Sequence, residues 1–493
     1  MSAFFHLGRV LFLLSCMLLT SCGGGGADVT AGIGGTGKTS GTITSFGSIF
    51  VNGVEYAIRP STDIQFDDHA GTADDLRVGM VVTVLGNSNG TTDLADRVIY
   101  DDNGEGPVSD IHNGPDIDLN GRPTTRIFSL LGLTVVVDAT GTVFAGLDFS
   151  SLADDDVVQV SGLFDQDGRL QATYVEKKGV LQPGTTVEVK GTVSNTTAAA
   201  FSLGTVRVEV GPSTDLTEIP GGTLANGQFV EASGIWIDST TIDATNGKVE
   251  LEEQLIGKDG DNLNLEGIVS DYVDDRDFKV AGLPVDSTNA QREPMNLALA
   301  DGLRVQVVGM VTSTGGHNVL NATAIKTRDG NFEIQARITA SPGVTIGDDT
   351  LNEGSIAVQA GDGTITVLTN SSTLLEDKTP RDAVPPLRLS DLSAGDFMRL
   401  RGYADDSGRF VATEARRDYP DDTLVQAPAE ASNGVNSITL MGVTFLTNGD
   451  TEFEDADNGD ISALTFYSLL NTGDAVRVED SRADGTAEEV KRR

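Results

Sequence analysis

The sequence has little of the chemistry from which most active sites are built. Its 493 residues include 2 cysteines, 4 histidines and 1 tryptophan, and aromatic residues make up 5% of the chain. A transition-metal site needs clustered thiolates or imidazoles, whereas His69, His112 and His317 are far apart in the sequence. No G-x-S-x-G nucleophile motif is present. We therefore predict no catalytic, cofactor-binding or metal-binding residues, and a protein that is not an enzyme.

Positive charge is also scarce. Lysine and arginine together number 34, against 73 aspartate and glutamate residues, and the formal net charge is −39. Such a surface repels the phosphates of nucleic acids and the headgroups of anionic lipids. We therefore expect no nucleic-acid partner, and we interpret the acidity mainly as a means of staying soluble.

Glycine, with 58 residues, is abundant, and this composition favours many short strands over long helices. One pattern recurs six times: a leucine, an anchor residue three positions later, two apolar residues separated by a polar one, and a second glycine. The anchors are Gly79, Asp155, Gly227, Gly302, Gly395 and Gly473. Alternation with a period of two predicts a central strand in each repeat, with one buried face and one solvated face.

Other signals place turns around this central strand. Asn52-Gly53 between alternating apolar runs predicts a β-hairpin. Asp74 and Asp75 belong to a predicted short helical turn before the central strand. For the second glycine of each pattern we expect a turn with positive φ. These closing positions are Gly86, Gly162, Gly234, Gly309 and Gly402, with Asp480 in the sixth repeat.

The order of three strands, a helical turn and two strands predicts a small closed barrel of the OB type. We expect an all-β fold, a tandem array of about six such barrels arranged as beads on a string, each with its own core. The predicted barrels are residues 40–103, 104–178, 184–256, 263–328, 331–418 and 425–493. Predicted linkers between them include the stretch from Asp101 to Pro107.

The N-terminus has the pattern of an export signal, and we predict that it is one. Arg9 precedes an apolar stretch from Val10 to Leu19, which is too short to span a bilayer. The sequence Leu-Thr-Ser-Cys that ends at Cys22 resembles the bacterial lipobox. That resemblance implies removal of residues 1–21 by cleavage between Ser21 and Cys22, lipidation of Cys22, and a glycine-rich tether over residues 22–39. Gly23 after the cysteine resembles the outer-membrane default of many Gram-negative bacteria.

A family resemblance covers the first repeat most closely. The run from Gly41 to Tyr56, GTITSFGSIFVNGVEY, and the run from Leu76 to Val84, LRVGMVVTV, are similar to bacterial lipoproteins built from the domain of unknown function 5666. The resemblance implies an envelope lipoprotein with repeated small β-domains. It implies no catalytic residues.

Two motifs resemble ligand sites without their expected context. GIGGTGKT, from Gly32 to Thr39, fits the phosphate-binding loop G-x-x-x-x-G-K-[ST], but a glycine tract precedes it and a predicted strand follows it. We therefore expect no nucleotide. The segment from Asp116 to Gly121 matches the opening of a calcium loop, yet Ile127 stands where the loop needs an acidic residue. A weak calcium affinity of the acidic turns stays open.

Three functions remain compatible with the sequence. The first is a non-enzymatic, lipid-anchored envelope protein that acts as a structural spacer or a multivalent binding array. The second is a carbohydrate-binding envelope lipoprotein, because OB-type barrels bind oligosaccharides. The third is an enzyme with its activity in a divergent repeat, the fifth in particular. The expected partners are the membrane, through the lipid, and an envelope protein or a glycan.

Overall fold

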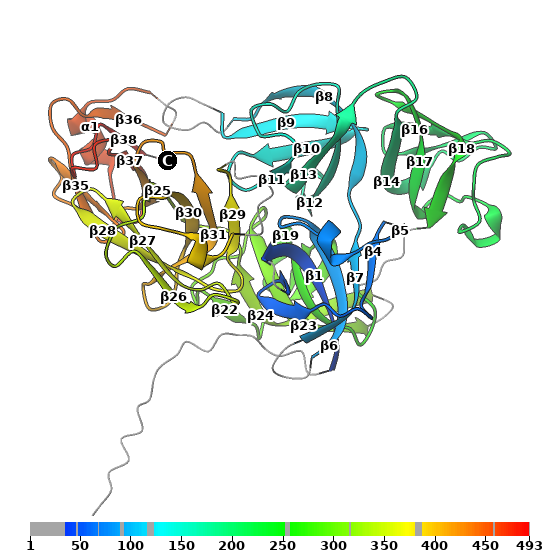
Figure 1. Cartoon of the computed structure of the whole chain (residues 1–493), viewed down its shortest axis with the longest axis horizontal. Coiled ribbons are helices and arrows are strands. Elements are labelled where there is room, and N and C mark those ends of the chain that lie inside the picture. The colour runs from blue at the N-terminus through cyan, green and yellow to red at the C-terminus, as the bar shows by residue number, and fades with distance from the viewer. Residues whose placement is uncertain are drawn as a thin grey trace, which may run out of the picture. The chain divides into compact units, whose positions relative to one another are not determined.

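The computed structural model describes residues 35–45, 48–67, 69–88, 93–115, 123–251, 257–314, 317–379, 387–456 and 459–492. About 57% of the described residues are in strands and 4% are in helices, which confirms the all-β prediction (Figure 1). Within the described residues, no helix has the length and apolar character needed to cross a membrane.

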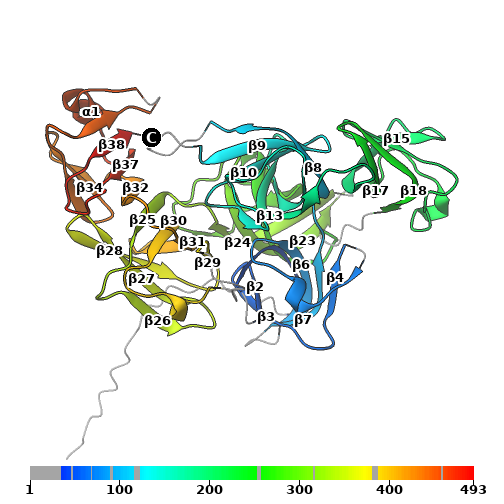
Figure 2. The ribbon, with the colours of Figure 1, turned by 45° about the horizontal axis from the view of Figure 1, so that its top comes forward.

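The first repeat closes into a five-stranded barrel. β1 pairs antiparallel with both β2 and β6, while β7 pairs antiparallel with β6 and parallel with β3, so the circuit β1-β2-β3-β7-β6 returns to β1. This is the strand order of an OB-type barrel, and Figure 2 shows these strands in blue. The elements are β1 (Gly35–Ser45), β2 (Ile49–Val51), β3 (Val54–Ala57), β4 (Asp63–Phe66), β5 (His69–Ala70), the 3-10 turn η1 (Ala73–Asp75), β6 (Val81–Ser88) and β7 (Asp93–Tyr100).

The next three repeats form the same closed circuit. The second contains β8 (Gly104–Asn113), β9 (Thr125–Leu130), β10 (Leu133–Asp138), β11 (Val143–Ala145), β12 (Asp156–Phe164) and β13 (Leu170–Val180). The third contains β14 (Thr186–Ser194), β15 (Ala200–Leu203), β16 (Val206–Glu209), η2 (Pro220–Gly222), β17 (Phe229–Asp238) and β18 (Thr241–Leu251). The fourth contains β19 (Asn262–Asp274), β20 (Asp277–Val280), β21 (Leu283–Asp286), β22 (Gln291–Glu293), β23 (Arg304–Thr314) and β24 (His317–Thr327).

The last two repeats are less regular. The fifth contains β25 (Phe332–Arg337), β26 (Val344–Asp348), β27 (Glu353–Ala360), β28 (Gly363–Thr369), β29 (Leu374–Asp377), η3 (Leu389–Asp391), β30 (Phe397–Ala404) and β31 (Phe410–Asp418). The sixth contains β32 (Leu424–Pro428), β33 (Ala431–Ser432), β34 (Ser437–Leu440), β35 (Val443–Leu446), β36 (Glu452–Glu454), α1 (Ala463–Leu469), β37 (Ala475–Glu479) and β38 (Glu489–Arg492). Their apolar residues form one continuous core cluster.

The repeats are joined through their first strands. β1 of the first repeat pairs parallel with β19 of the fourth, β8 of the second pairs antiparallel with β14 of the third, and β25 of the fifth pairs antiparallel with β32 of the sixth. The result is three large sheets that each span two repeats. The array is therefore not the string of separate beads that we expected, because backbone hydrogen bonds connect the barrels in pairs.

The central strands bury their apolar residues as predicted. Each apolar position of the pattern is at most 1% exposed. The twelve residues are Val82, Val84, Val158, Val160, Val230, Ala232, Val305, Val307, Met398, Leu400, Val476 and Val478. The predicted hairpin also forms, with Asn52 and Gly53 at positive φ between β2 and β3. The short helical turn is η1.

The opposite face of the central strand differs from the prediction. Of the polar residues between the apolar pairs, Gln159, Glu231, Gln306 and Arg477 are buried instead of solvated. Gln159 donates a hydrogen bond to Asp102 in the connection between the first and second repeats. Gln306 donates to the backbone carbonyl of Asn52 in the first repeat. These polar positions are buried because neighbouring repeats meet there.

The closing glycine of the pattern has another role than we expected. Positive φ is found at the anchors, where the glycines lie between +87° and +93° and Asp155 at +67°. The closing glycines instead lie where the central strand shifts register against its partner. A Cβ at Gly402 would overlap the carbonyl oxygen of Val411, and one at Gly162 that of Gln171. The closing glycine therefore permits close backbone approach at a β-bulge.

Candidate functional site

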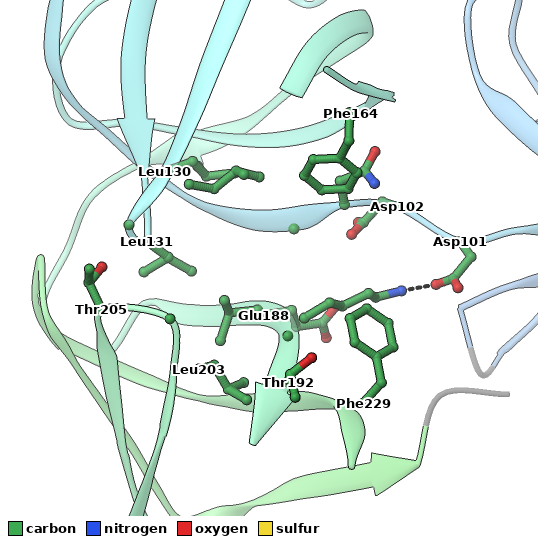
Figure 3. Close-up of a pocket in the computed structure, with 18 of the residues that line it drawn as sticks. Asp101, Asp102, Leu130, Leu131, Phe164, Glu188, Thr192, Leu203, Thr205 and Phe229 are labelled. Atoms are coloured by element: carbon green, nitrogen blue, oxygen red, sulfur yellow. Dashed lines mark ion pairs between the residues drawn. The ribbon is translucent and has the colours of Figure 1, made fainter. Parts of the chain in front are cut away.

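A cavity of about 640 Å³ lies where the second and third repeats join. Its walls come from the hairpin between β9 and β10, from β14, and from the turn between β15 and β16. Its interior is lined by apolar side chains, among them those of Leu130, Leu131 and Leu203 (Figure 3). Leu133 also belongs to the lining. The volume falls within the usual range for a small-molecule site.

Two phenylalanine rings flank this cavity. Phe164 ends β12 and Phe229 begins β17, and they are 48% and 42% exposed. In Figure 3 both rings lie on the side of the cavity where Asp101 and Asp102 are found. Large apolar side chains are usually buried. Two exposed rings beside an apolar cavity are therefore a candidate contact surface for a ligand.

A group of carboxylates, which we call the acidic cluster, lies at the same place. It consists of Asp67, Asp101, Asp102, Glu188 and Glu231, and these residues come from the first three repeats and their connections. Lys190 of β14 forms ion pairs with Asp101, with Glu231 at 3.0 Å and with Asp67 at 3.6 Å. Burial, opposed by Lys190, raises the pKa of Asp67.

Asp102 is the most deeply buried member of the acidic cluster, with 2% of its surface exposed. Its backbone N–H donates to Asp67 Oδ1 at 3.2 Å, and its Oδ2 accepts from Gln159 Nε2 at 2.5 Å. Its Oδ1 is buried and has no hydrogen-bond partner among the described residues. Burial, together with the Asp67 carboxylate, raises the pKa of Asp102 well above its usual range.

The strand register adds another carboxylate. Glu188 of β14 lies directly opposite Glu105 of β8 in the pairing that joins the second and third repeats. Like charges opposite each other on antiparallel strands are destabilising. Burial raises the pKa of Glu105, and the Asp67 carboxylate contributes to the increase. The join therefore concentrates negative charge on both of the strands that form it.

Several residues singled out from the sequence lie outside the described part of the chain. These are Ser21 and Cys22, and the calcium-like motif from Asp116 to Gly121. Cleavage and lipidation at Cys22 stay predictions. His69, His112 and His317 are exposed and belong to different repeats. The groups of carboxylates close enough to hold a cation, within the described residues, contain none of these histidines.

The phosphate-loop motif is a strand over its described part. β1 begins at Gly35, before the predicted end of the tether at Thr39, and pairs with β6 on one side and β19 on the other. Lys38 forms an ion pair with Asp261 at 2.9 Å, and the Thr39 hydroxyl hydrogen-bonds with the Tyr56 hydroxyl at 2.5 Å. A phosphate-binding lysine follows a loop whose N–H groups face the ligand, whereas here the backbone forms sheet pairs.

Sequence reasoning missed the acidic cluster because its key residues lie in a predicted linker. Asp101 to Pro107 has a composition typical of a turn, yet β8 begins at Gly104 and pairs with β12 and β14. These pairings bury Asp102. Asp101 and Asp102 are adjacent in the sequence, but no neighbouring residue indicated that Asp102 is buried.

Comparison with known families identifies the repeats. The family described as "Domain of unknown function (DUF5666)" matches residues 40–98, 105–176, 190–246, 347–416 and 426–491, about two thirds of the chain. The protein therefore belongs to this family of repeated domains of unknown function. The fourth barrel is outside these matches, although its strands form the same circuit as those of the first three.

Other comparisons add little. No curated protein matches the chain. A solved structure described as "drosophila Unr CSD456" is similar at 13% sequence identity over 47% of this chain and 97% of the other, with a TM-score of 0.11.

Proposed function

We propose that this tandem array of β-domains is a non-enzymatic lipoprotein of the cell envelope that binds a partner. In this proposal Cys22 carries the lipid, the Gram-negative outer membrane holds it, and the barrels present a binding surface. The cavity between the second and third repeats is the main support, because Phe164 and Phe229 expose large apolar surface beside it. An apolar group of an envelope partner fits this lining.

In-cell photocrosslinking tests the binding site. A photoreactive amino acid in place of Phe164 should crosslink a partner. The matched control replaces Leu464 of α1, which is 81% exposed and lies in the sixth repeat. Crosslinks that are identical from both positions, or absent from Phe164, would contradict the proposed site.

The anchor and the lack of catalysis have separate tests. The Cys22→Ala variant should lose incorporation of labelled fatty acid, and continued labelling would refute the lipid anchor. Purified mature protein should turn over no glycan, peptide or phosphoester in a broad activity screen. Turnover that survives repurification would show that a repeat is catalytic.

An oligosaccharide is the second candidate ligand, and the two exposed rings favour it as well. Aromatic faces can cover sugar rings, and OB-type barrels bind oligosaccharides on a sheet face. A glycan array probed with the wild type and with the Phe164→Ala/Phe229→Ala double variant distinguishes the candidates. Binding that the double variant loses would favour the glycan, whereas no signal from the wild type would remove this candidate.

A further inference from the structure

Three carboxylates of the acidic cluster converge on one point. Asp67 follows β4, Asp102 lies between β7 and β8, and Glu188 belongs to β14. One oxygen of each lies within 4.8 Å of the others. Two oxygens that each lie about 2.4 Å from one calcium ion can be at most about 4.8 Å apart. The three carboxylates therefore meet the distance condition that each pair of ligands of one ion must satisfy.

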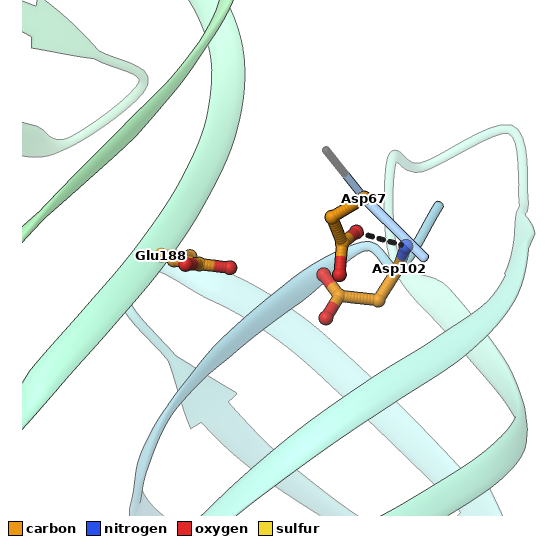
Figure 4. Close-up of side chains that lie close together, drawn as sticks. All are labelled: Asp67, Asp102 and Glu188. Atoms are coloured by element: carbon orange, nitrogen blue, oxygen red, sulfur yellow. Dashed lines mark hydrogen bonds between the residues drawn. The ribbon is translucent and has the colours of Figure 1, made fainter. Parts of the chain in front are cut away.

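Asp102 gives an independent indication that a cation belongs there. Its side chain is almost fully buried, and one of its oxygens has no partner among the described residues. Figure 4 shows the Asp102 carboxylate directed toward Asp67 and Glu188. A buried charged oxygen without a partner is costly unless an ion or a donor satisfies it.

We propose that Asp67, Asp102 and Glu188 form a Ca²⁺ site at the junction of the first three repeats. All three ligands are hard oxygens, which suit Ca²⁺ and give no preference for zinc or copper. Calcium accepts six to eight oxygens with variable geometry, so that water can complete the coordination. Magnesium needs a near-ideal octahedron at shorter distances and gives up its water ligands reluctantly, so a cluster of three carboxylates supplied by the protein suits it less.

Lys190 is the competing cation in the acidic cluster. Its ammonium pairs with Asp101, Glu231 and Asp67, so it shares one carboxylate with the proposed site. A single ammonium cannot neutralise five carboxylates. Calcium therefore binds while Lys190 keeps its ion pairs, and the Asp67 carboxylate contacts both cations. The positive charge of the lysine lowers the affinity of the site for calcium.

Calcium titration of the purified mature protein tests the site directly. Isothermal titration calorimetry should detect one site with a Kd of about 10⁻⁴ to 10⁻³ M, as in extracellular calcium modules. Saturating Ca²⁺ should raise Tm by about 2 °C or more, and Mg²⁺ at equal concentration should raise it less.

Two variants distinguish calcium bound at this site from calcium that only screens the negative charge of the whole chain. Asp102→Asn keeps the shape of the side chain and should abolish both the calorimetric signal and the calcium-specific rise in Tm. The matched control, Asp167→Asn, removes the same charge from a turn of the second repeat where the side chain is 61% exposed. It should respond to calcium as the wild type does.

The proposal is overturned if the wild type shows no calcium-specific signal, or if Asp102→Asn retains it. An equal response to magnesium would show screening only, which also overturns the proposal. A third variant, Lys190→Met, tests the site by a gain of affinity: removing the competing ammonium should tighten calcium binding several-fold. If that variant fails to fold, the comparison of Asp102→Asn with Asp167→Asn decides the question.

Discussion

Two junctions between repeats solve the problem of buried charge in opposite ways. At the junction of the first and fourth repeats, Glu266 is fully buried and contacts Arg304 at 2.8 Å and Arg328 at 3.3 Å. Its other oxygen accepts from the Thr42 N–H at 2.7 Å. At the acidic cluster, five carboxylates surround one lysine, and Asp102 keeps an unsatisfied oxygen.

The pKa directions follow this difference. Although burial alone would raise the pKa of Glu266, the two guanidinium groups and the Thr42 N–H lower it to about 2. Burial and a neighbouring carboxylate raise the pKa of Asp102 instead. At the first junction protein groups alone satisfy the buried charge of Glu266, and for that reason we call it the complete junction; the second gains from a bound cation. One junction is thus suited to holding repeats together and the other to responding to a ligand.

The largest expected effect comes from breaking the complete junction. Glu266→Gln removes a charge that two buried or partly buried arginines contact, so both guanidinium groups lose this ion pair. We expect a loss of about 3–5 kcal/mol in the free energy of unfolding, measured by urea denaturation at pH 7.

The control for this change is the same substitution at an exposed pair. Glu209→Gln removes a contact with Arg207 at 3.3 Å, where the side chains are 45% and 55% exposed. Surface pairs contribute about 1 kcal/mol or less. Equal losses in the two variants would mean that the Glu266 junction adds no more than a surface ion pair.

Acid should weaken the complete junction next. Because the pKa of Glu266 falls from an ordinary 4.5 to about 2 on folding, its contribution is full above pH 4.5 and is lost as the pH falls to about 2. The loss should be about 3 kcal/mol. Other carboxylates titrate in the same range, so the measurement is the difference in unfolding free energy between wild type and Glu266→Gln. A difference that does not shrink between pH 4.5 and 2 would contradict this account.

At the acidic cluster the same type of change should have the opposite sign. Without calcium, Asp102→Asn should stabilise the protein by about 1 kcal/mol, because it removes the repulsion between a buried carboxyl and the Asp67 carboxylate, and the Asp102 Oδ1 has no partner among the described residues. The amide oxygen can still accept from Gln159, and the backbone N–H of residue 102 still donates to Asp67. Thermal unfolding in a chelator measures the effect.

Asp480→Asn is the control for this stabilisation, because it makes the same change at a buried aspartate whose two oxygens both have partners. Asp480 is 1% exposed, and its two oxygens accept from the N–H groups of Asp484 at 3.1 Å and Gly485 at 2.9 Å. In this variant the amide NH₂ group faces a backbone N–H, and two donors cannot form a hydrogen bond. We therefore expect a loss of about 1–3 kcal/mol in the free energy of unfolding. If Asp102→Asn loses stability as well, the Asp102 charge is compensated by the protein alone.

The sequence predicted what depends on local periodicity. The alternation around Val82 and Val84 is sufficient to predict a buried central strand, and Asn52-Gly53 is sufficient for a hairpin. Neither requires knowledge of a distant residue. The OB-type strand order followed from repeating these local signals in each repeat.

The junctions could not be predicted in this way. The pairing of β1 with β19 joins residues more than two hundred positions apart, and it is this pairing that places Glu266 beside Thr42. Asp102 had the composition of a linker and became buried only through the pairings of β8. Long-range pairing therefore determines both the candidate site and the buried ion pairs.

The smallest effect is expected at the edge of the complete junction. Lys38 contacts Asp261 at 2.9 Å, and the two side chains are 23% and 14% exposed. Lys38→Ala should lower the free energy of unfolding by about 1 kcal/mol or less, because water reaches both charged groups of this ion pair in the wild type. It should also leave the response to ATP and magnesium unchanged, since Lys38 lies in a paired strand and not in a phosphate-binding loop. Thermal unfolding with and without Mg-ATP measures both. A nucleotide-dependent rise in Tm that this variant loses would make Lys38 a phosphate ligand, and the edge of the junction would then be a second binding site.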